Sequence, residues 1–157
     1  MKKLHYLFIC YLFIINCDAQ RFDLASEKFE VGDIFIAYLI YDLDKWNIRE
    51  ENKLILDSLV ILMKQNTNLI MEVGTHTNKI NPALSMRLDS RRSKSVVDYM
   101  ISNGISISRL IPKGYGDQKP LIKHEDIEKI NSEEERIKAM AMNRRTEFKI
   151  LKIDFED

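Results

Sequence analysis

The side chains best suited to hold a small polar ligand lie between residues 74 and 92, in the stretch GTHTNKINPALSMRLDSRR. The side chains of Thr75, His76, Thr77 and Asn78 place hydrogen-bond donors and acceptors on a predicted polar turn, and Arg92 adds a planar guanidinium suited to a carboxylate. A polar turn between a strand and a helix is a common ligand position in α/β folds. The same side chains can instead cap the helix and satisfy its backbone, so both interpretations stay open here.

Ser85, Leu88 and Arg92 recur at helical spacing and share one helix face. No catalytic pattern accompanies them. The three His residues do not combine with Cys or Asp at metal-site spacing, no Ser has a GxSxG context, and the glycines at 114 and 116 lack a Walker Lys-Ser/Thr pair. The sequence therefore predicts a binding protein that is not an enzyme and has no cofactor and no metal.

The length of 157 residues is typical of one domain, and the composition (45% hydrophobic, 31% charged) is that of a globular protein. The 24 basic and 24 acidic side chains balance, which argues against a nucleic-acid partner, since such a partner needs a clustered basic surface.

Residues 1–19 have the character of a signal peptide: a Lys-Lys start precedes an apolar run of about 12 residues, too short to span a bilayer. Two processing routes remain open. Cleavage after Ala19 would release a chain starting at Gln20, whereas a lipobox-like stretch would make Cys17 a lipidated N-terminus. A lipid at Cys17 would be the only membrane attachment expected. We expect a short segment over 20–28, a domain over 29–153 and a tail over 154–157.

Hydrophobic periodicity and turn residues predict the elements of this domain. The expected elements are a buried strand over 33–42, a helix over 48–65, a strand over 69–73, a helix over 82–103 stopped by Gly104, a short strand over 105–113, a turn at 114–116, a surface loop over 120–131, a helix capped by Ser132 and a half-buried strand over 143–153. The order β-α-β-α-β-(α)-β predicts an α/β fold, an α+β sandwich in which helices pack on one face of a mixed sheet.

Five motifs occur in the order and register of the OmpA C-terminal-like family of peptidoglycan-binding domains (OmpA/Pal/MotB). They are GTHTN at 74–78, which resembles GxHTD; LDSRRSKSVV at 88–97, which resembles LSxxRAxxV; NGI with SRL at 103–110; KGYGDQKP at 113–120; and NRRTEF at 143–148. Tyr41-Asp42 and Lys45-Trp46 also resemble the start of this domain in some branches. The resemblance covers about residues 29–152.

The resemblance implies a non-catalytic module that binds the diaminopimelate of peptidoglycan stem peptides, through Asp for the ammonium and Arg for the carboxylate. Arg92 matches that Arg, Asn78 stands at the position of the Asp, and Ser85 stands where the family usually has Asn. Arg145 matches an Arg beside the site. The site expected from these matches comprises Thr77, Asn78, Ser85, Leu88, Arg92 and Arg145.

The expected function is to anchor the outer membrane or an envelope complex to the cell wall, at the periplasmic side of the envelope. The alternative is a degenerate module that keeps the fold and serves as a protein-interaction subunit of an envelope complex. The neutral Asn78 and Ser85 favour this alternative, whereas Arg92 and Arg145 favour wall binding. The expected partners are peptidoglycan and, in the second case, outer-membrane or other envelope proteins.

Overall fold

The computed structural model describes residues 4–5, 29–78 and 82–153. The predicted signal peptide lies outside this part of the chain except for residues 4 and 5, and the predicted lipidation residue Cys17 lies wholly outside it. The segment 20–28 and the tail 154–157 fall outside as well.

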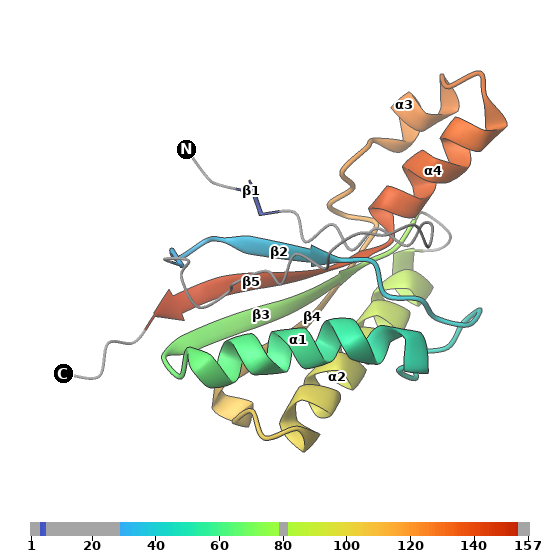
Figure 1. The fold of residues 1–157 in the computed structure, drawn as a ribbon. Helices are drawn as coiled ribbons and strands as arrows, with labels where there is room; N and C mark the ends of the chain where they lie inside the picture. The colour runs from blue at the N-terminus through green and yellow to red at the C-terminus, as the bar shows by residue number, and fades with distance from the viewer. Residues whose placement is uncertain (1–3, 6–28, 79–81, 154–157) are drawn as a thin grey trace, which may run out of the picture.

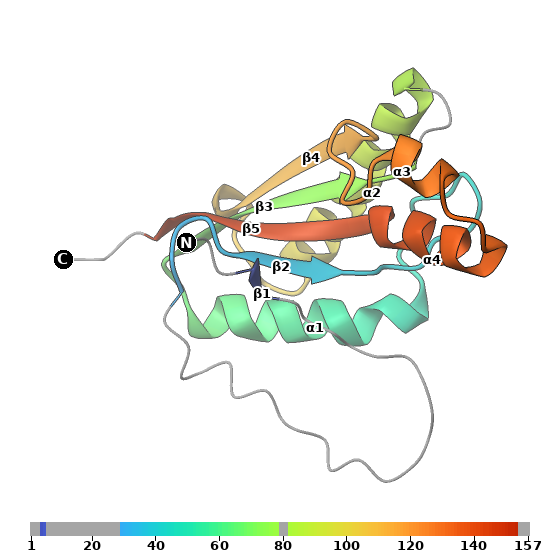
Figure 2. The same ribbon diagram turned by 90° about the horizontal axis from the view of Figure 1, so that it is seen from above.

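One mixed sheet organises the described residues (Figure 2), in the strand order β1-β2-β5-β3-β4. The strands are β1 (Leu4–His5), β2 (Ile34–Ala37), β3 (Leu69–His76), β4 (Leu110–Gly116) and β5 (Arg145–Ile153). β5 is antiparallel to β2 and β3, whereas β3 and β4 are parallel, as are β1 and β2. This sheet confirms the predicted fold class, and β1 adds a two-residue edge strand that the sequence did not predict.

Helices α1 (Glu50–Gln65) and α2 (Pro82–Ser102) lie on the same face of the sheet (Figure 1). The predicted apolar stripe of α1 is confirmed, and α2 ends before Gly104, whose φ of +93° suits only glycine without strain. The core between helices and sheet contains Leu56, Leu59, Val60 and Met63 of α1, Val96 and Met100 of α2, and Phe35, Met71, Val73, Phe148 and Ile150 of the strands.

β2 is shorter than the predicted strand over 33–42. Its pairing ends at Ala37, opposite Thr146 near the start of β5. Beyond that point, Asn52 of α1 binds both backbone groups of Ile40: its Oδ1 accepts from the amide N–H and its Nδ2 donates to the carbonyl, each at 2.8 Å. Residues 38–49 therefore leave the sheet as a loop, called the strap below.

β3 is longer than predicted at its polar end. The turn expected after Val73 begins only at Thr77, because Thr75 and His76 pair with both neighbouring strands. β4 likewise runs through the Gly-Tyr-Gly expected as a turn, after a single 3₁₀ turn over Ile107–Arg109. A Cβ at Gly74 would lie 2.8 Å from Cε2 of Tyr115, so this glycine gives the Tyr115 ring its place against β3.

The segment predicted as a surface loop over 120–131 contains a short helix, α3 (His124–Glu128). It precedes α4 (Glu133–Asn143), whose predicted cap is confirmed: Ser132 Oγ accepts from the backbone N–H of Glu135. Both helices project from one end of the sheet (Figure 1). Asn143 Oδ1 accepts from the amides of Leu121 and Ile122, which ties this projection to β5.

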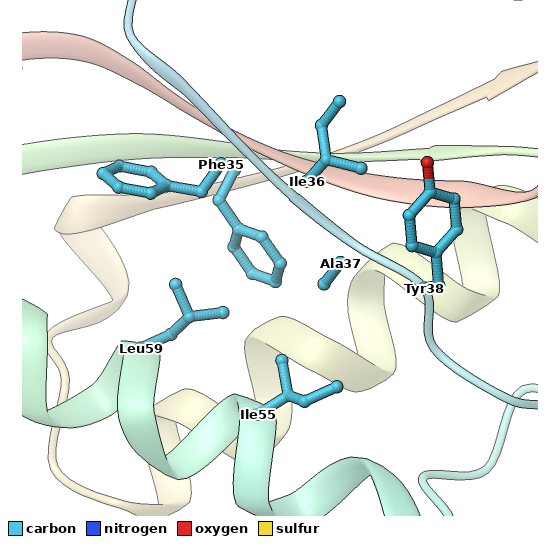
Figure 3. Close-up of a pocket in the computed structure, with 7 residues that line it drawn as sticks. Phe35, Ile36, Ala37, Tyr38, Ile55 and Leu59 are labelled. Atoms are coloured by element: carbon cyan, nitrogen blue, oxygen red, sulfur yellow. The ribbon is translucent and has the colours of Figure 1, made fainter. Parts of the chain in front are cut away.

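A cavity of about 40 Å³ lies between β2 and α1 (Figure 3). Phe35 and Ala37 point from the strand toward Leu59 and Ile55 of the helix, whereas Ile36 points to the other side. The lining is almost entirely apolar and the space is close to that of one or two water molecules. This cavity is a packing gap of the core, and Tyr38 is the one lining residue whose side chain carries a polar group.

Candidate functional site

A groove of about 1010 Å³ crosses the end of the sheet where β3, α2, the strap and the start of β5 meet. Its lining residues are Tyr38 to Asp44 and Trp46 of the strap, Thr75, His76, Thr77 and Asn78 at the end of β3, Arg87, Leu88, Arg91 and Arg92 of α2, and Ala141, Met142, Arg144, Arg145 and Thr146 around the α4–β5 junction. The strap contributes mainly apolar and aromatic side chains, and the other lining segments contribute polar side chains and five arginines. Such a combination suits an elongated ligand that carries charged groups.

The strap is held on α2 by two neighbouring arginines. Arg92 Nε donates to the carbonyl of Lys45 at 3.0 Å, and its guanidinium lies 4.4 Å from the ring centroid of Tyr41. The Arg91 guanidinium lies 4.5 Å from the ring centroid of Trp46. These cation–π contacts and one charge-assisted hydrogen bond fix the wall that faces the polar turn.

Arg92 keeps part of its hydrogen-bonding capacity for a ligand. Within the residues that the structure describes, its two terminal nitrogens have no hydrogen bond. Burial lowers the pKa of Arg92, while the nearby Asp89 and Tyr41 act in the opposite direction. An arginine remains cationic at neutral pH in such surroundings, so this side chain presents a positive donor pair in the groove.

Arg145 lies in the groove wall but is fully engaged with the protein. Its Nε donates to Glu147 Oε1 at 2.8 Å, its Nη2 lies 2.6 Å from the same oxygen, and its Nη groups donate to the carbonyls of Lys119 and Asn143. Only 4% of Arg145 is exposed. The residue therefore organises the wall, and its predicted direct contact with a ligand remains a prediction.

His76 belongs to the same charged cluster. Its Nε2 lies 3.4 Å from Glu147 Oε2, and its ring stacks on Tyr115 with centroids 4.7 Å apart and an interplanar angle of 10°. Burial alone would raise the pKa of Glu147, but the interaction with His76 and the charge of Arg145 hold it near 2. His76 is thus a packed strand residue and not the turn residue that the sequence suggested.

Several buried polar atoms around the groove have no hydrogen-bond partner among the described residues. They are Tyr41 Oη, Thr75 Oγ1, His76 Nδ1 and both carboxyl oxygens of Asp89. Buried polar atoms are nearly always paired with protein groups or water, and leaving them unpaired is costly. Their concentration around one groove indicates a place where a polar ligand or ordered water completes the hydrogen bonding.

Five of the six predicted site residues come together in this groove. Thr77 and Asn78 follow β3, Leu88 and Arg92 lie on α2, and Arg145 begins β5. Ser85 lies in the first turns of α2, and its side chain is outside the described part of the chain.

Sequence reasoning missed the strap as a wall of the site, and it missed Asp89 and Glu147 as buried charges beside it. The strap could have been recognised from its Tyr41-Asp42 and Lys45-Trp46 pairs, which resemble the start of the domain in some branches of the family. Neither buried carboxyl group could be recognised from the sequence, because the burial of Asp89 and Glu147 depends on the tertiary packing of other strands and helices around them.

In the part of the chain that the structure describes, no group of three or more His, Cys, Asp or Glu side chains could hold a metal ion. Among the described helices, none is both long and apolar enough to cross a membrane.

Residues 40–134 match the model of the family described as "OmpA family". This chain belongs to the OmpA family. The match covers more than half of the 157 residues and contains the strap, the end of β3, α2 and β4. The family resemblance predicted from the five motifs is confirmed.

Among curated proteins, outer membrane protein A of Bordetella avium is 28% identical over 119 residues, which cover 75% of this chain and 56% of that protein. Outer membrane porin F of Pseudomonas fluorescens is 29% identical over 82 residues, which cover 52% of this chain and 25% of that protein. The chain therefore spans about half or less of the length of these relatives, both of which are named as outer-membrane proteins.

Solved structures share the fold. A MotB-like protein from Desulfovibrio vulgaris superposes with a TM-score of 0.63 at 20% identity, covering 78% of this chain and 74% of that one. The peptidoglycan-associated lipoprotein from Burkholderia pseudomallei gives 0.58 at 15% identity, covering 71% and 87%. The cell wall anchor of the T6SS from Pseudomonas aeruginosa gives 0.57 at 18% identity, covering 73% and 76%.

Proposed function

We propose that this protein binds cell-wall peptidoglycan non-covalently in the groove and so anchors the outer membrane or an envelope complex to the wall. The observation that carries the proposal is the position of Arg92. Arg92 is a cation that lines the groove, and its two terminal nitrogens have no hydrogen bond among the described residues. Several buried polar atoms around the groove also have no hydrogen-bond partner among these residues. A guanidinium fork pairs with a carboxylate through two parallel hydrogen bonds, which gives both affinity and orientation.

The proposed ligand is the diaminopimelate of a stem peptide. Its carboxylate would pair with the terminal nitrogens of Arg92, and its ammonium would lie near the side-chain oxygen of Asn78. Thr77 would contribute to the backbone turn beside the ligand, and Leu88 would provide an apolar contact between its carboxylate and its ammonium. The length of the groove leaves room for the rest of the stem peptide along the strap.

Two relatives in fold support this assignment by their descriptions, since one is a peptidoglycan-associated lipoprotein and another a cell wall anchor. The curated relatives are outer-membrane proteins, which supports a place in the cell envelope, at its periplasmic side. The proposed activity is binding without catalysis. Ser93, a serine of α2 without a GxSxG context, is buried, and its hydroxyl donates a hydrogen bond to the carbonyl of Ser90.

A second candidate is a protein-interaction subunit of an envelope complex. Large apolar side chains on the groove wall favour it: Leu43 is 87% exposed, and Ile40 and Met142 are also exposed. An exposed apolar rim next to charged residues is a common feature of protein interfaces. In this case the groove would hold a segment of another envelope protein in place of a stem peptide.

Pull-down of the purified protein with isolated sacculi, with and without free diaminopimelate as competitor, distinguishes wall binding from protein interaction. We expect retention on sacculi that diaminopimelate reduces, and loss of that retention in Arg92→Ala. Lys94→Ala, on the exposed side of the same helix, serves as the control and should be retained normally. No retention of the unmodified protein would reject wall binding and leave the protein-interaction candidate.

A further inference from the structure

Asp89 is a buried acid beside the groove that no function described above uses. It lies in α2 one turn before Arg92, and none of its surface is exposed. Neither carboxyl oxygen has a hydrogen-bond partner among the described residues. Burying a carboxyl group without such partners is costly, and a native fold that retains one generally has a use for it.

The carboxyl group lies behind the polar wall of the groove. Burial raises the pKa of Asp89 to about 7, against the opposing effects of the Arg92 charge and of the nearby backbone N–H groups of Gly116 and Thr77, which favour the carboxylate although neither is positioned to donate a hydrogen bond to it. These amides belong to the ends of β4 and β3, which meet where the Thr77 N–H donates to the Gly116 carbonyl at 3.0 Å. Asp89 is therefore close to the turn that carries Asn78, on one side, and to Arg92 on the other.

The groove itself has an excess of positive charge. Five arginines and two aspartates line it. Of the two acids, Asp42 pairs with Arg49 at 2.8 Å and lies on the outer strap, and Asp44 lies on the same strap with a φ of 54°. At the position where an acid would face a ligand ammonium, this chain has the neutral Asn78.

We propose that Asp89 is the acidic partner of the site: its carboxylate supplies, from behind the Thr77–Asn78 turn, the negative charge that attracts the ammonium of the ligand. The inference rests on the proposed function, because it requires a ligand that carries both an ammonium and a carboxylate. Arg92 then binds the carboxylate, Asn78 accepts a hydrogen bond from the ammonium, and Asp89 provides the charge that an amide lacks. A single helical turn positions both charges of the site.

Charged and titratable groups face Asp89 from three elements. Arg92 on its own helix favours the ionised carboxylate, Asp117 after β4 disfavours it, and Tyr41 on the strap also interacts with it. A bound ammonium adds a positive charge, so it favours ionisation and releases a proton when Asp89 is protonated beforehand. Binding of an amine-bearing ligand should therefore tighten as the pH rises through about 7.

Titration with two peptides tests the proposal. The first is a diaminopimelate-containing muropeptide, and the second is the same peptide acetylated on the side-chain amine of diaminopimelate. For the unmodified protein at pH 8 we expect the amine-bearing peptide to bind roughly 5- to 30-fold more tightly, the difference expected between charged and neutral hydrogen bonding. At pH 6 this ratio should shrink, since Asp89 is then largely protonated.

Asp89→Asn should reduce the ratio to near 1 at both pH values while leaving the acetylated peptide bound. Asp89→Ser provides a second, smaller replacement, and melting curves establish that both variants fold. The matched control is Asp98→Asn, which removes an acid from the exposed side of the same helix, where Asp98 pairs with Lys94, and should keep the ratio and its pH dependence.

The ratio is the deciding quantity. If it survives in a folded Asp89→Asn or Asp89→Ser variant, or if it is lost equally in Asp98→Asn, the acidic partner is not Asp89. If the unmodified protein binds neither peptide, the proposed function itself fails and this inference fails with it. Binding of both peptides with equal affinity would overturn the role of Asp89 while leaving carboxylate binding by Arg92 intact.

Discussion

Arg92 of α2 donates a hydrogen bond from Nε to the carbonyl of Lys45 at 3.0 Å, although 47 residues separate the two. The bond and the stacking of Arg92 on Tyr41 hold the strap against the helix. They use one nitrogen and one face of the guanidinium, and the two terminal nitrogens stay unpaired among the described residues. One side chain therefore both builds the groove and offers its main cationic group to a ligand.

Replacing Arg92 should abolish binding to sacculi with a smaller effect on folding. Loss of one partner of a charged pair typically costs about 2–5 kcal/mol of binding free energy. The lost bond to Lys45 should cost the fold about 1.5–3 kcal/mol, the usual range for a hydrogen bond that involves a charged group. Pull-down and thermal melting of Arg92→Ala measure the two effects separately.

Arg92→Lys is the informative companion variant. A lysine keeps the charge but presents a single ammonium and no fork, so it should bind more weakly than the native protein. Lys94→Ala, which removes a cation from the exposed side of the same helix, is the matched control and should retain the binding. Normal sacculus binding by a folded Arg92→Ala protein would contradict the assigned site, and a collapse of its melting temperature would indicate a mainly structural role.

The pair of Glu147 with His76 and Arg145 should stabilise the protein in a pH-dependent way. The pKa of Glu147 falls from 4.5 to about 2 on folding, so its contribution is present above pH 4.5 and is lost as the pH falls toward 2. Glu147→Gln should lower the free energy of unfolding by about 2–3 kcal/mol at pH 7 and by much less near pH 2. Urea unfolding across this pH range provides the measurement.

Glu134→Gln is the control for this experiment. Glu134 pairs with Lys138 on the surface of α4, and most surface ion pairs contribute little. Its removal should leave the unfolding midpoint unchanged at every pH. Equal destabilisation of Glu147→Gln at pH 7 and near pH 2 would mean that packing of the side chain, and not its charge, is what matters.

Asp89 should have the opposite effect on stability. Its pKa rises from 3.8 to about 7 on folding, so the folded state retains a proton that the unfolded state loses between these values. Stability therefore decreases as the pH rises from about 4 to 7 and then levels off. Asp89→Asn should stabilise the protein by about 2–4 kcal/mol at pH 8 and have little effect at pH 4.

The same variant that weakens ligand discrimination should thus make the fold more stable, which separates a binding defect from a folding defect. Melting temperatures at pH 4 and pH 8 provide the comparison. Asp98→Asn is the matched control, because Asp98 lies on the exposed side of the same helix in a pair with Lys94. A loss of stability at pH 8 in Asp89→Asn would mean that the carboxylate has a partner that stabilises the fold.

The sequence predicted the helices and the sheet well because their apolar periodicity is regular. The stripe of α1, the cap at Ser132 and the alternation of β5 were all readable from spacing alone. Strand ends were predicted less well, since they depend on long-range partners. Ile40 leaves the sheet because Asn52 binds its backbone, and His76 stays in the sheet because Arg145 pairs with it.

The site was predicted from motifs and from helical spacing, which bring Leu88 and Arg92 to one face. The hydrogen-bond partners of each polar side chain could not be predicted from motifs or spacing. The sequence does not distinguish the roles of Arg145 and Arg92. In the structure, Arg145 pairs with Glu147 and donates hydrogen bonds to two backbone carbonyls. The terminal nitrogens of Arg92, in contrast, have no hydrogen bond among the described residues. That difference arises from tertiary packing.

Export should remove the first residues of the chain. We expect a mature protein that begins at Gln20 or at a lipidated Cys17, because a short apolar run ends in small residues. Either cleavage removes β1, whose two residues pair only with β2 at the sheet edge, and leaves the core residues in place. Intact-mass measurement of protein from the native envelope decides between the two. A cytosolic protein whose mass retains residues 1–15 would contradict export.

Asn78→Asp should strengthen the binding of diaminopimelate peptides, and by an amount that depends on Asp89. An amide oxygen accepts a hydrogen bond from an ammonium without adding charge, so a carboxylate at this position is worth about 1–2 kcal/mol more, or roughly 5- to 30-fold in affinity. In the native background the gain should be smaller, because a second carboxylate near Asp89 raises the pKa values of both. In the Asp89→Asn background the full gain should return.

Calorimetric titration of the four proteins of this cycle, at low and at high salt, gives the coupling between the two positions. The gain should shrink at high salt, since the turn borders the open groove and part of the effect is Coulombic. The matched control is Asn66→Asp at the C-terminal end of α1, outside the groove, which should leave affinity unchanged. If Asn78→Asp gives no gain even when Asp89 is replaced, the ammonium does not bind at Asn78 and the orientation of the ligand in the groove must be reversed.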